Sequence, residues 1–488
     1  MRFFLSLVLP LMLYSPDLSA GHVVINGSAP GFENQPVKLV TVTDLISNLE
    51  ITLDNDTISA NSGFSLSADV SEICFAWISI FNVKAYIYLE PGKTYNISLL
   101  CKDELTDSIN SRLYSVFPIE TVPIFEAADS TDLNVLLGDF NYLYNVFILD
   151  NVDQLITGRK KQLVDSLKLA MFARFSVFHN PYLNNYINYR FAGLEMMQQI
   201  GGKETIAMTY LATNPILYNN TEYIAFISEY FKHYFALGSL IKRNEELHQA
   251  INVERSYASL IRLMRADSVI IENAELRELV MLKGLYEIFN NPAFDKEAIR
   301  EIMEFVKAKS QIPTDKIIAG SLISKLYRFE KGTIVKDFAL QDWADSTYSL
   351  SQYKGKFVYL LFWTSWCTPC LREMAMLESF REKYSDWFVF IGIMTDGNKQ
   401  MMKKTATTYK FQFPFLHVES QPDLPERFGV ISFPTGVFID PDGKLITQSA
   451  RLPSTNLEAL IREVYFILKE NEKSKTPHTF NKLWDDMD

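Results

Sequence analysis

Two cysteines, Cys367 and Cys370, follow directly after a long apolar run and are separated by Thr368 and Pro369. The run at 357–363 reads Phe-Val-Tyr-Leu-Leu-Phe-Trp, which predicts a parallel strand buried on both faces. Pro369 favours the first turn of a helix, because its missing N–H costs nothing there. The sequence therefore predicts a strand, a cysteine pair and a helix in succession, which is the layout of a dithiol/disulfide couple.

The position of the pair predicts which sulfur reacts. The N-terminus of a helix carries partial positive charge, and this charge lowers the pKa of a nearby thiol. We therefore expect Cys367 to be the exposed nucleophile. Cys370 lies one helical turn deeper and is expected to be the resolving thiol.

The residues that follow continue an α/β pattern. Apolar runs predict strands at 387–394, 415–418, 436–440 and 444–447, with a polar helical segment at 396–410. Pro434 cannot donate to a strand ladder, so it should lie at the entrance of the strand at 436–440, where a cis bond is allowed. Thr455 and Glu458 have the spacing of a capping box before a final helix that runs to Leu468.

The segment from 331 to 470 resembles a thioredoxin-fold domain of the TlpA/ResA-like disulfide reductase family. The resemblance rests on the Trp-Cys-x-Pro-Cys run, on the lead-in at 335–340 and 350–356, and on Phe-Pro-Thr at 433–435. It implies that Pro434, expected to be cis, packs against the cysteine pair. The implied substrate groove consists of Trp366, Thr368, Pro369, Phe433 and Pro434.

The same resemblance implies a role for Glu373, which matches a family glutamate that tunes thiol protonation. Two positions depart from the family pattern. Met374 stands where the family usually has proline, and Leu361 stands where ordinary thioredoxins carry a buried aspartate. Both departures leave the redox potential open.

The cysteines do not form a convincing metal motif. A tetrahedral zinc site needs four ligands, and there is no second Cys-x-x-Cys pair. The histidines at 22, 179, 233, 248, 417 and 478 show no paired ligand spacing. We therefore expect no metal and no organic cofactor. A closed, inert disulfide in a binding module is a further interpretation of Cys367 and Cys370.

The N-terminus predicts export. Met1-Arg2 precedes an apolar stretch at 3–14 and small residues ending at Ala20, which is typical of a secretory signal peptide at 1–20, cleaved after about Ala20. No cysteine lies near the cut, so a lipid anchor is not expected. Because no later apolar run has membrane length, we expect a soluble mature chain in the periplasm.

Length and charge bound the architecture. A chain of 488 residues with 48% hydrophobic residues suggests about three domains with large cores. The net charge of −11 argues against a general nucleic-acid binder and against binding to anionic membranes. The expected fold class is multidomain, with the α/β thioredoxin fold preceded by a small β-sandwich-like domain and an all-α helical domain.

The segment 21–110 shows short alternating strands with turn signals, which predicts the β-sandwich-like domain. It loosely resembles the β-rich accessory domain of exported Bacteroidetes proteins. Cys74 and Cys101 both lie in this segment. They would form a structural disulfide in an oxidising compartment, or remain two isolated buried thiols.

The segment 111–330 shows helical periodicity. Apolar stripes predict helices at 133–147, 163–178, 223–235, 276–289 and 298–306, the first capped by Ser130 or Thr131. The aromatic side chains at 223–235 are expected to be core residues rather than a partner groove. His233 is expected to be structural or solvated rather than catalytic. The stretch 471–488 is expected to be a poorly ordered tail.

These observations predict a periplasmic enzyme that exchanges thiols and disulfides with protein substrates. A membrane-linked donor is expected to re-reduce it. The sequence is also compatible with a homo-oligomer. Two alternatives remain open. Thr364 precedes Cys367 by three positions, as in thiol peroxidases, although Cys370 and the lack of an upstream proline argue against this function. The chain could also be a binding or scaffold protein with a vestigial thioredoxin module.

Overall fold

The computed structural model divides into two compact units, which are described separately; one holds the described residues up to 321 and the other those from 322 on. The structure describes residues 20–80, 83–99, 119–126, 129–158, 160–237, 243–397, 399–421, 423–430, 432–462 and 465–466. The expected signal peptide, Cys101 and the expected tail lie outside them. Among these residues, no helix combines the length and apolar character needed to cross a membrane.

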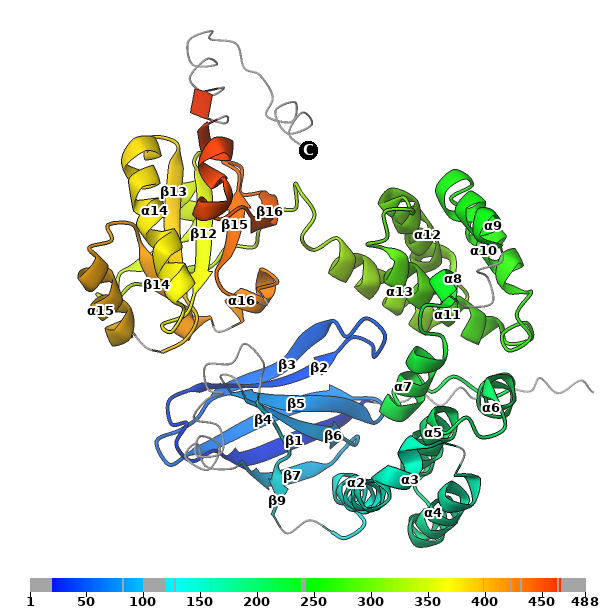
Figure 1. Ribbon diagram of the computed structural model, residues 1–488. Coiled ribbons are helices and arrows are strands. Elements are labelled where there is room, and N and C mark those ends of the chain that lie inside the picture. Colours follow the sequence, from blue (N-terminus) through cyan, green and yellow to red (C-terminus); the bar gives the residue numbers. More distant parts are fainter. Residues whose placement is uncertain are drawn as a thin grey trace, which may run out of the picture. The chain divides into compact units, whose positions relative to one another are not determined.

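The second unit is a seven-stranded sheet with helices against it (Figure 1). The strand order is β11-β10-β14-β13-β12-β15-β16. The strands are β10 (Ala339–Gln341), β11 (Thr347–Ser349), β12 (Phe357–Trp363), β13 (Phe388–Met394), β14 (Phe415–His417), β15 (Thr435–Ile439) and β16 (Leu445–Ala450). The helices are α14 (Thr368–Tyr384), α15 (Lys399–Tyr409) and α16 (Leu424–Arg427), with short 3₁₀ turns η4 (Leu350–Tyr353), η5 (Val418–Ser420) and η6 (Pro453–Thr455).

Strand β12 is the centre of this unit, and all of its side chains are buried. It pairs in parallel with β13 and antiparallel with β15, so the predicted parallel strand has one antiparallel neighbour. Because successive side chains point to opposite faces, Tyr359 and Trp363 join the apolar cluster under α14, while Leu360 and Phe362 join the cluster on the other face. The continuous apolar run of the sequence thus reflects a strand covered on both sides.

The predicted strands and the predicted helix at 396–410 are present in this unit, with ends shifted by a few residues. The predicted final helix is seen at 457–462, and its expected end at Leu468 lies outside the described residues. The capping box is wrong. Thr455 does accept from the backbone N–H of Leu452, but Glu458 forms ion pairs with Lys383 at 3.1 Å and Arg462 at 3.3 Å. Glu458 therefore joins two helices through its charge and does not cap the helix in which it lies.

The first unit contains two sheets. One has the strand order β4-β1-β7-β9 and the other β3-β2-β5-β6-β8. The strands are β1 (Gly21–Ser28), β2 (Pro36–Val42), β3 (Glu50–Thr57), β4 (Gly63–Val70), β5 (Cys74–Ile80), β6 (Val83–Leu89), β7 (Thr94–Ser98), β8 (Ile119–Thr121) and β9 (Ile124–Phe125). Alternate residues of β4, β6 and β7 are buried, as the period of two in the sequence predicts.

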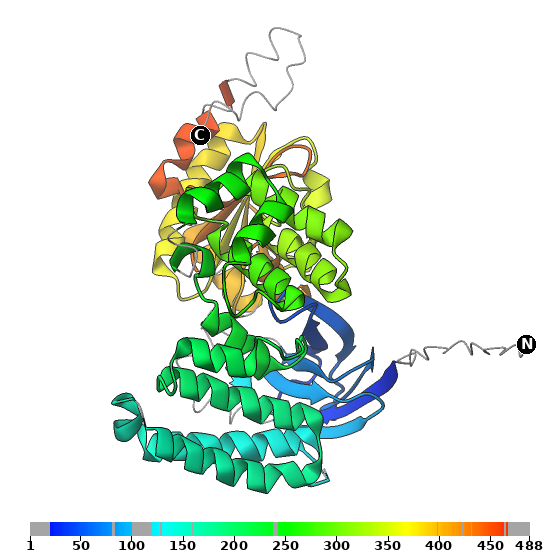
Figure 2. The ribbon, with the colours of Figure 1, turned by 90° about the vertical axis from the view of Figure 1, so that its right-hand side faces the viewer.

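The helices of this unit follow the sheets along the chain and are coloured from cyan to green (Figure 2). They are α2 (Leu133–Asp150), α3 (Val152–Ile156), α4 (Lys161–Phe175), α5 (Pro181–Met197), α6 (Lys203–Tyr210), α7 (Thr221–Tyr230), α8 (Tyr234–Leu237), α9 (Asn244–His248), α10 (Tyr257–Met264), α11 (Ala274–Ile288), α12 (Lys296–Lys309) and α13 (Pro313–Leu326), with a 3₁₀ turn η1 (Ser176–Phe178) and a π-helical turn η3 (Gln249–Val253).

Two local predictions for these helices need correction. Helix α2 is capped by the side chain of Asp132, which accepts from Asn134 N–H at 2.8 Å, and not by Ser130 or Thr131. The stretch 223–235 is divided into α7 and α8, because His233 takes a positive φ of 54° between them. Most aromatic residues there are core residues as expected: Tyr223, Phe226, Phe231, Tyr234 and Phe235 are buried, and Tyr230 is half-buried.

The β-rich and helical segments lie in one compact unit, whereas the sequence suggested two domains. Tyr88 on β6 shows why: its ring packs edge-on against Tyr182 and Tyr186 of α5, and its hydroxyl bonds Thr221 at the start of α7 at 3.0 Å. Its backbone N–H and carbonyl both bond the amide side chain of Asn134 on α2. The helices therefore pack against the aromatic outer face of the sheet.

A buried pair of carboxyl groups joins α11 to α13 in this unit. Asp315 is fully buried and accepts a hydrogen bond from Tyr218 Oη at 2.9 Å. Glu278 is also buried and accepts from Tyr257 Oη at 2.5 Å and from Ser310 Oγ. Loss of hydration, reinforced by the negative charges of Glu278 and a second glutamate on α11, raises the pKa of Asp315 to about 8. Asp315 is therefore protonated at neutral pH.

We predict that Asp315→Asn flattens the pH dependence of stability. The folded chain holds this proton up to about pH 8, whereas an unfolded aspartate releases it near its ordinary pKa. Stability from this group is thus complete at acid pH and falls as pH rises towards 8, by at most about 1.4 kcal/mol per pH unit. Calorimetric unfolding of both proteins from pH 5 to 8 checks this, and parallel curves would contradict it.

Candidate functional site

The disulfide between Cys367 and Cys370 lies where β12 passes into α14. Cys367 is the N-cap of α14, and its Sγ atom accepts a hydrogen bond from the backbone N–H of Cys370 at 3.1 Å. Pro369 occupies the first turn of the helix, as its spacing predicted. The sulfur of Cys367 thus sits on the unsatisfied N–H groups at the positive end of a helix.

The exposure of the two sulfurs differs from the prediction for Cys367. In the disulfide form Cys367 is 3% exposed and Cys370 is fully buried. Both belong to the apolar cluster under α14, because a disulfide is apolar and packs with the core. The neighbouring Trp366 is half-exposed, and Thr368 and Pro369 are exposed. The surface at this site therefore comes from the residues around the cysteines.

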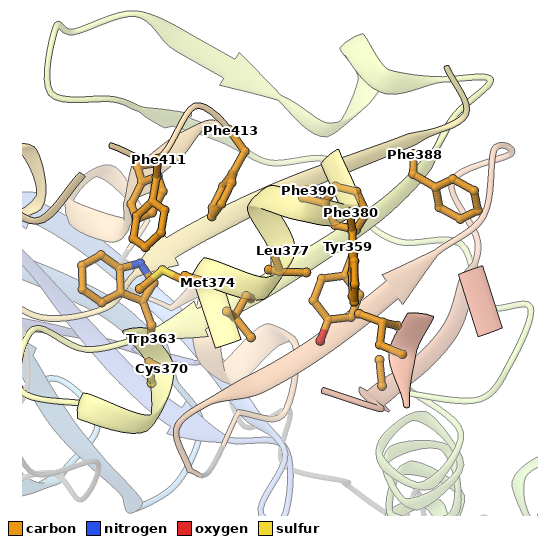
Figure 3. Packing of buried hydrophobic residues seen from close by; sticks show 14 of the residues in the cluster. Tyr359, Trp363, Cys370, Met374, Leu377, Phe380, Phe388, Phe390, Phe411 and Phe413 are labelled. Atoms are coloured by element: carbon orange, nitrogen blue, oxygen red, sulfur yellow. The ribbon is translucent and has the colours of Figure 1, made fainter. Parts of the chain in front are cut away.

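The cluster behind the disulfide is large and aromatic (Figure 3). Figure 3 shows Trp363, Met374 and Cys370 together at one end of it. Met374, which departs from the family pattern, is fully buried and fills this space. Leu361, the second departure, is also buried, and its neighbours on the two adjacent strands are Gly392 and Gly436. Both departures therefore serve as core residues.

The second expected part of the groove is the loop before β15. The peptide bond between Phe433 and Pro434 is cis, as the sequence indicated. The ring of Phe433 packs edge-on against Trp366, with centroids 6.4 Å apart. This contact brings the Phe-Pro-Thr loop beside the cysteine loop, although the two are far apart in the sequence.

Glu373 is buried on the inner side of α14 and is fully engaged. Its two carboxylate oxygens accept from the backbone N–H of Ser454 at 2.9 Å and from Ser454 Oγ at 2.6 Å. Ser454 lies in η6, so the carboxylate ties α14 to the chain after β16. Sequence reasoning missed Ser454, since nothing local relates two residues that are 81 positions apart.

Sequence reasoning also missed Asp396, which follows β13. Its carboxylate is buried and accepts two hydrogen bonds from Ser365, the residue before Trp366. A signal was available: β12 and β13 are both apolar runs followed by polar residues, and the carboxyl ends of parallel strands share one sheet edge. Polar residues just beyond such strands belong to one site.

Among the described residues, no group of three or more histidines, cysteines, aspartates or glutamates could hold a metal ion. Cys74 lies on β5 with its Sγ 3.1 Å from Thr41 Oγ1, and burial raises the pKa of its thiol. Since Cys101 lies outside the described residues, the pairing of these two cysteines stays a prediction.

Known proteins match the second unit. A model of the AhpC/TSA family matches residues 332–448. Over 126 residues the chain is 32% identical to the thiol-disulfide oxidoreductase ResA of Bacillus cereus, covering 26% of this chain and 72% of that protein. The chain belongs to the ResA-like family of thiol-disulfide oxidoreductases.

Other known proteins also resemble this unit. The thioredoxin-like protein YneN of Bacillus subtilis is 29% identical over 117 residues, covering 23% of this chain and 68% of that protein. A crystal structure of a proposed thiol-disulfide oxidoreductase from Bacteroides vulgatus is 26% identical, covers 28% of this chain and 98% of that chain, and gives a TM-score of 0.27. The 32% identity to ResA over 72% of that protein makes this ResA-like chain a thiol-disulfide oxidoreductase.

We predict that Glu373→Ala destabilises the second unit by about 1–3 kcal/mol, because it removes a buried charged acceptor together with its two hydrogen bonds from Ser454. Glu373→Gln keeps one acceptor and should cost less. The matched control is Glu382→Ala, which removes an exposed glutamate from the same helix. Thermal unfolding of the three variants measures the effect. Equal stability of Glu373→Ala and Glu382→Ala would contradict the anchoring role.

Proposed function

We propose that this protein is a periplasmic reductase of protein disulfides that works through Cys367 and Cys370. One observation carries the proposal: the Sγ atom of Cys367 caps α14 and accepts the Cys370 N–H. When the disulfide opens, the same N–H and the helix dipole stabilise a thiolate on that atom. The thiolate is the form that attacks disulfides.

The proposed reaction runs in two exchanges. The Cys367 thiolate attacks one sulfur of a substrate disulfide, which forms a mixed disulfide and releases the other substrate sulfur as a thiolate. Cys370 then loses its proton and attacks the Sγ of Cys367, which releases the second substrate thiol. Two electrons pass to the substrate, and the enzyme ends with the Cys367–Cys370 disulfide present in the structure.

The proposed surroundings follow from this direction. An external dithiol donor must return two electrons to the disulfide, and we assign this role to a membrane-linked protein. The groove around the disulfide comprises Trp366 and Phe433, whose rings are in contact, with Pro434, Thr368 and Pro369 beside them. An exposed aromatic ring next to the sulfur suits an unfolded or extended protein substrate. The role of Glu373 as a group that tunes thiol protonation stays part of this proposal.

The peroxidase alternative depends on Thr364. In that chemistry the threonine hydroxyl would bind the reactive sulfur, but Thr364 Oγ1 is buried and has no hydrogen-bond partner among the described residues. The scaffold alternative would make Cys367 and Cys370 dispensable. Both alternatives are therefore separated from the reductase by the experiment below.

We predict a reduction potential of about −270 mV for the Cys367–Cys370 couple. Equilibrating the mature chain with thiol buffers measures this potential. Cys370→Ser should accumulate mixed disulfides, because the resolving thiol is missing. Cys367→Ser should form none at this site. A background of Cys74→Ser and Cys101→Ser removes the other thiols of the chain.

Other results would lead to other functions. A potential of about −120 mV would make the protein an oxidant. Peroxide consumption with a burst that depends on Cys367 would favour a peroxidase. A couple that does not exchange with thiol buffers at all would favour the scaffold.

We also propose that the first unit selects client proteins. A fragment of residues 327–488, which begins after α13 ends at Leu326, should reduce insulin as fast as the full chain and have the same potential. In the Cys370→Ser background it should trap fewer envelope proteins than the full chain. Identical sets of trapped proteins would contradict the role of the first unit.

A further inference from the structure

The segment that leads into Cys367 is hydrogen-bonded to the residues just after the neighbouring strand, β13. The parallel pairing of β12 with β13 ends at Trp363 and Met394. Beyond it, Thr395 donates both its backbone N–H and its hydroxyl to the carbonyl of Trp363, at 3.0 and 3.3 Å. These bonds hold the start of the loop to β13 after the ladder has ended.

Asp396 holds the next part of the loop. One carboxylate oxygen accepts the backbone N–H of Ser365 at 2.7 Å, and the other accepts Ser365 Oγ at 2.6 Å. The residue is 6% exposed. Burial raises the pKa of this carboxyl group, while the two Ser365 bonds oppose the rise. Hydrogen bonds to a charged, buried acceptor are among the strongest in proteins.

His417 on β14 fixes Asp396 from behind. Its Nδ1 accepts the backbone N–H of Glu419 at 3.1 Å, so the ring proton lies on Nε2. Nε2 then donates to the backbone carbonyl of Asp396 at 3.1 Å. The histidine is buried as well. His417 on β14 therefore fixes the backbone of Asp396. The carboxylate of Asp396 in turn binds the loop that follows β12.

Hydrogen bonds within the loop connect Ser365 and its neighbours to Cys367. The backbone N–H of Cys367 donates to the carbonyl of Thr364 at 3.1 Å, and Thr368 N–H donates to the carbonyl of Trp366 at 3.1 Å. These two bonds flank the contact between Cys370 N–H and Cys367 Sγ. In the disulfide form the covalent bond also restrains Cys367. In the dithiol form only the hydrogen bonds remain.

We propose that Asp396 is a positioning residue for the redox couple: through Ser365 it keeps Cys367 Sγ on the N-terminus of α14 when the disulfide is open. This inference deepens the proposed function and rests on it. Because the anchor matters more in the dithiol form than in the disulfide form, its loss destabilises the reduced state selectively. The protein then becomes harder to reduce, and its thiolate is less well held for attack.

The test uses three variants of the full mature chain. Asp396→Ala removes both bonds and should shift the potential about 30 mV more negative, which is a tenfold change in the equilibrium constant of a two-electron couple. Mixed-disulfide formation with a model disulfide should slow in parallel. Asp396→Asn keeps an acceptor for Ser365 N–H and should restore most of both properties. Ser365→Ala loses only the hydroxyl bond and should fall between them.

Asp337→Ala is the matched control. Asp337 also accepts two backbone N–H groups in this unit, from Phe338 at 2.9 Å and Ser351 at 3.1 Å, but its loop does not lead to the cysteines. It should lower thermal stability while leaving potential and reactivity as in the wild type. This separates positioning from a general loss of stability.

Two results would overturn the inference. If Asp396→Ala and Ser365→Ala both keep the wild-type potential, the anchor does not act on the couple. If Asp396→Asn shifts the potential as far as Asp396→Ala, the negative charge is responsible and not the anchoring. An unreactive wild-type Cys367 would instead overturn the proposed function itself, so the two failures are distinguishable. Ser365→Ala retains the main-chain bond and keeps the test decisive if Asp396→Ala does not fold.

Discussion

The second unit is built around strand β12, and the contact between Cys367 Sγ and the N-terminus of α14 depends on that strand. For this contact to exist, a strand must end and a helix must begin within a few residues, at a fixed angle. Strand β12 provides the fixed end because apolar side chains cover both of its faces. A strand held in this way has little freedom to move, so the first turn of α14 is placed by packing and the sulfur by the helix.

Two buried acids of this unit, Glu373 and Asp396, hold neighbouring segments together in the same way. Each carboxylate accepts one backbone N–H and one hydroxyl from a single serine, Ser454 or Ser365. A buried carboxylate without partners would be costly, so each is retained with its donors. Glu373 joins α14 to the segment after β16, and Asp396 joins β13 to the cysteine loop.

The first unit follows a different logic. The outer face of a sheet can meet water when its residues are polar, but the outer face of β5 and β6 carries Phe75, Tyr86 and Tyr88. The ring of Phe75 stacks on that of Tyr86 and packs at a tilt against that of Tyr88. Tyr88 also contacts α5 and the start of α7, while Asn134 of α2 bonds its backbone. This apolar face explains why the sheets and the helices form a single compact unit. It also means that the helices cannot be removed without exposing the sheet.

The sequence by itself determined the strand, cysteine pair and helix, the strands that follow, the place of Pro434 before a strand and the core role of most aromatic residues at 223–235. It allowed the cis bond before Pro434, which the family resemblance implied. These features have local signals: side-chain period, proline geometry and turn residues. Tertiary structure alone decided that Cys367 is buried in the disulfide form, that Asp132 caps α2, and that Glu373 and Asp396 each find a serine. Asp132 is the near miss, since its type was as favourable as that of its neighbours. The other outcomes depend on which strands become neighbours. A pair such as Glu373 and Ser454 is brought together only when the whole sheet has formed, and no local pattern records that closure.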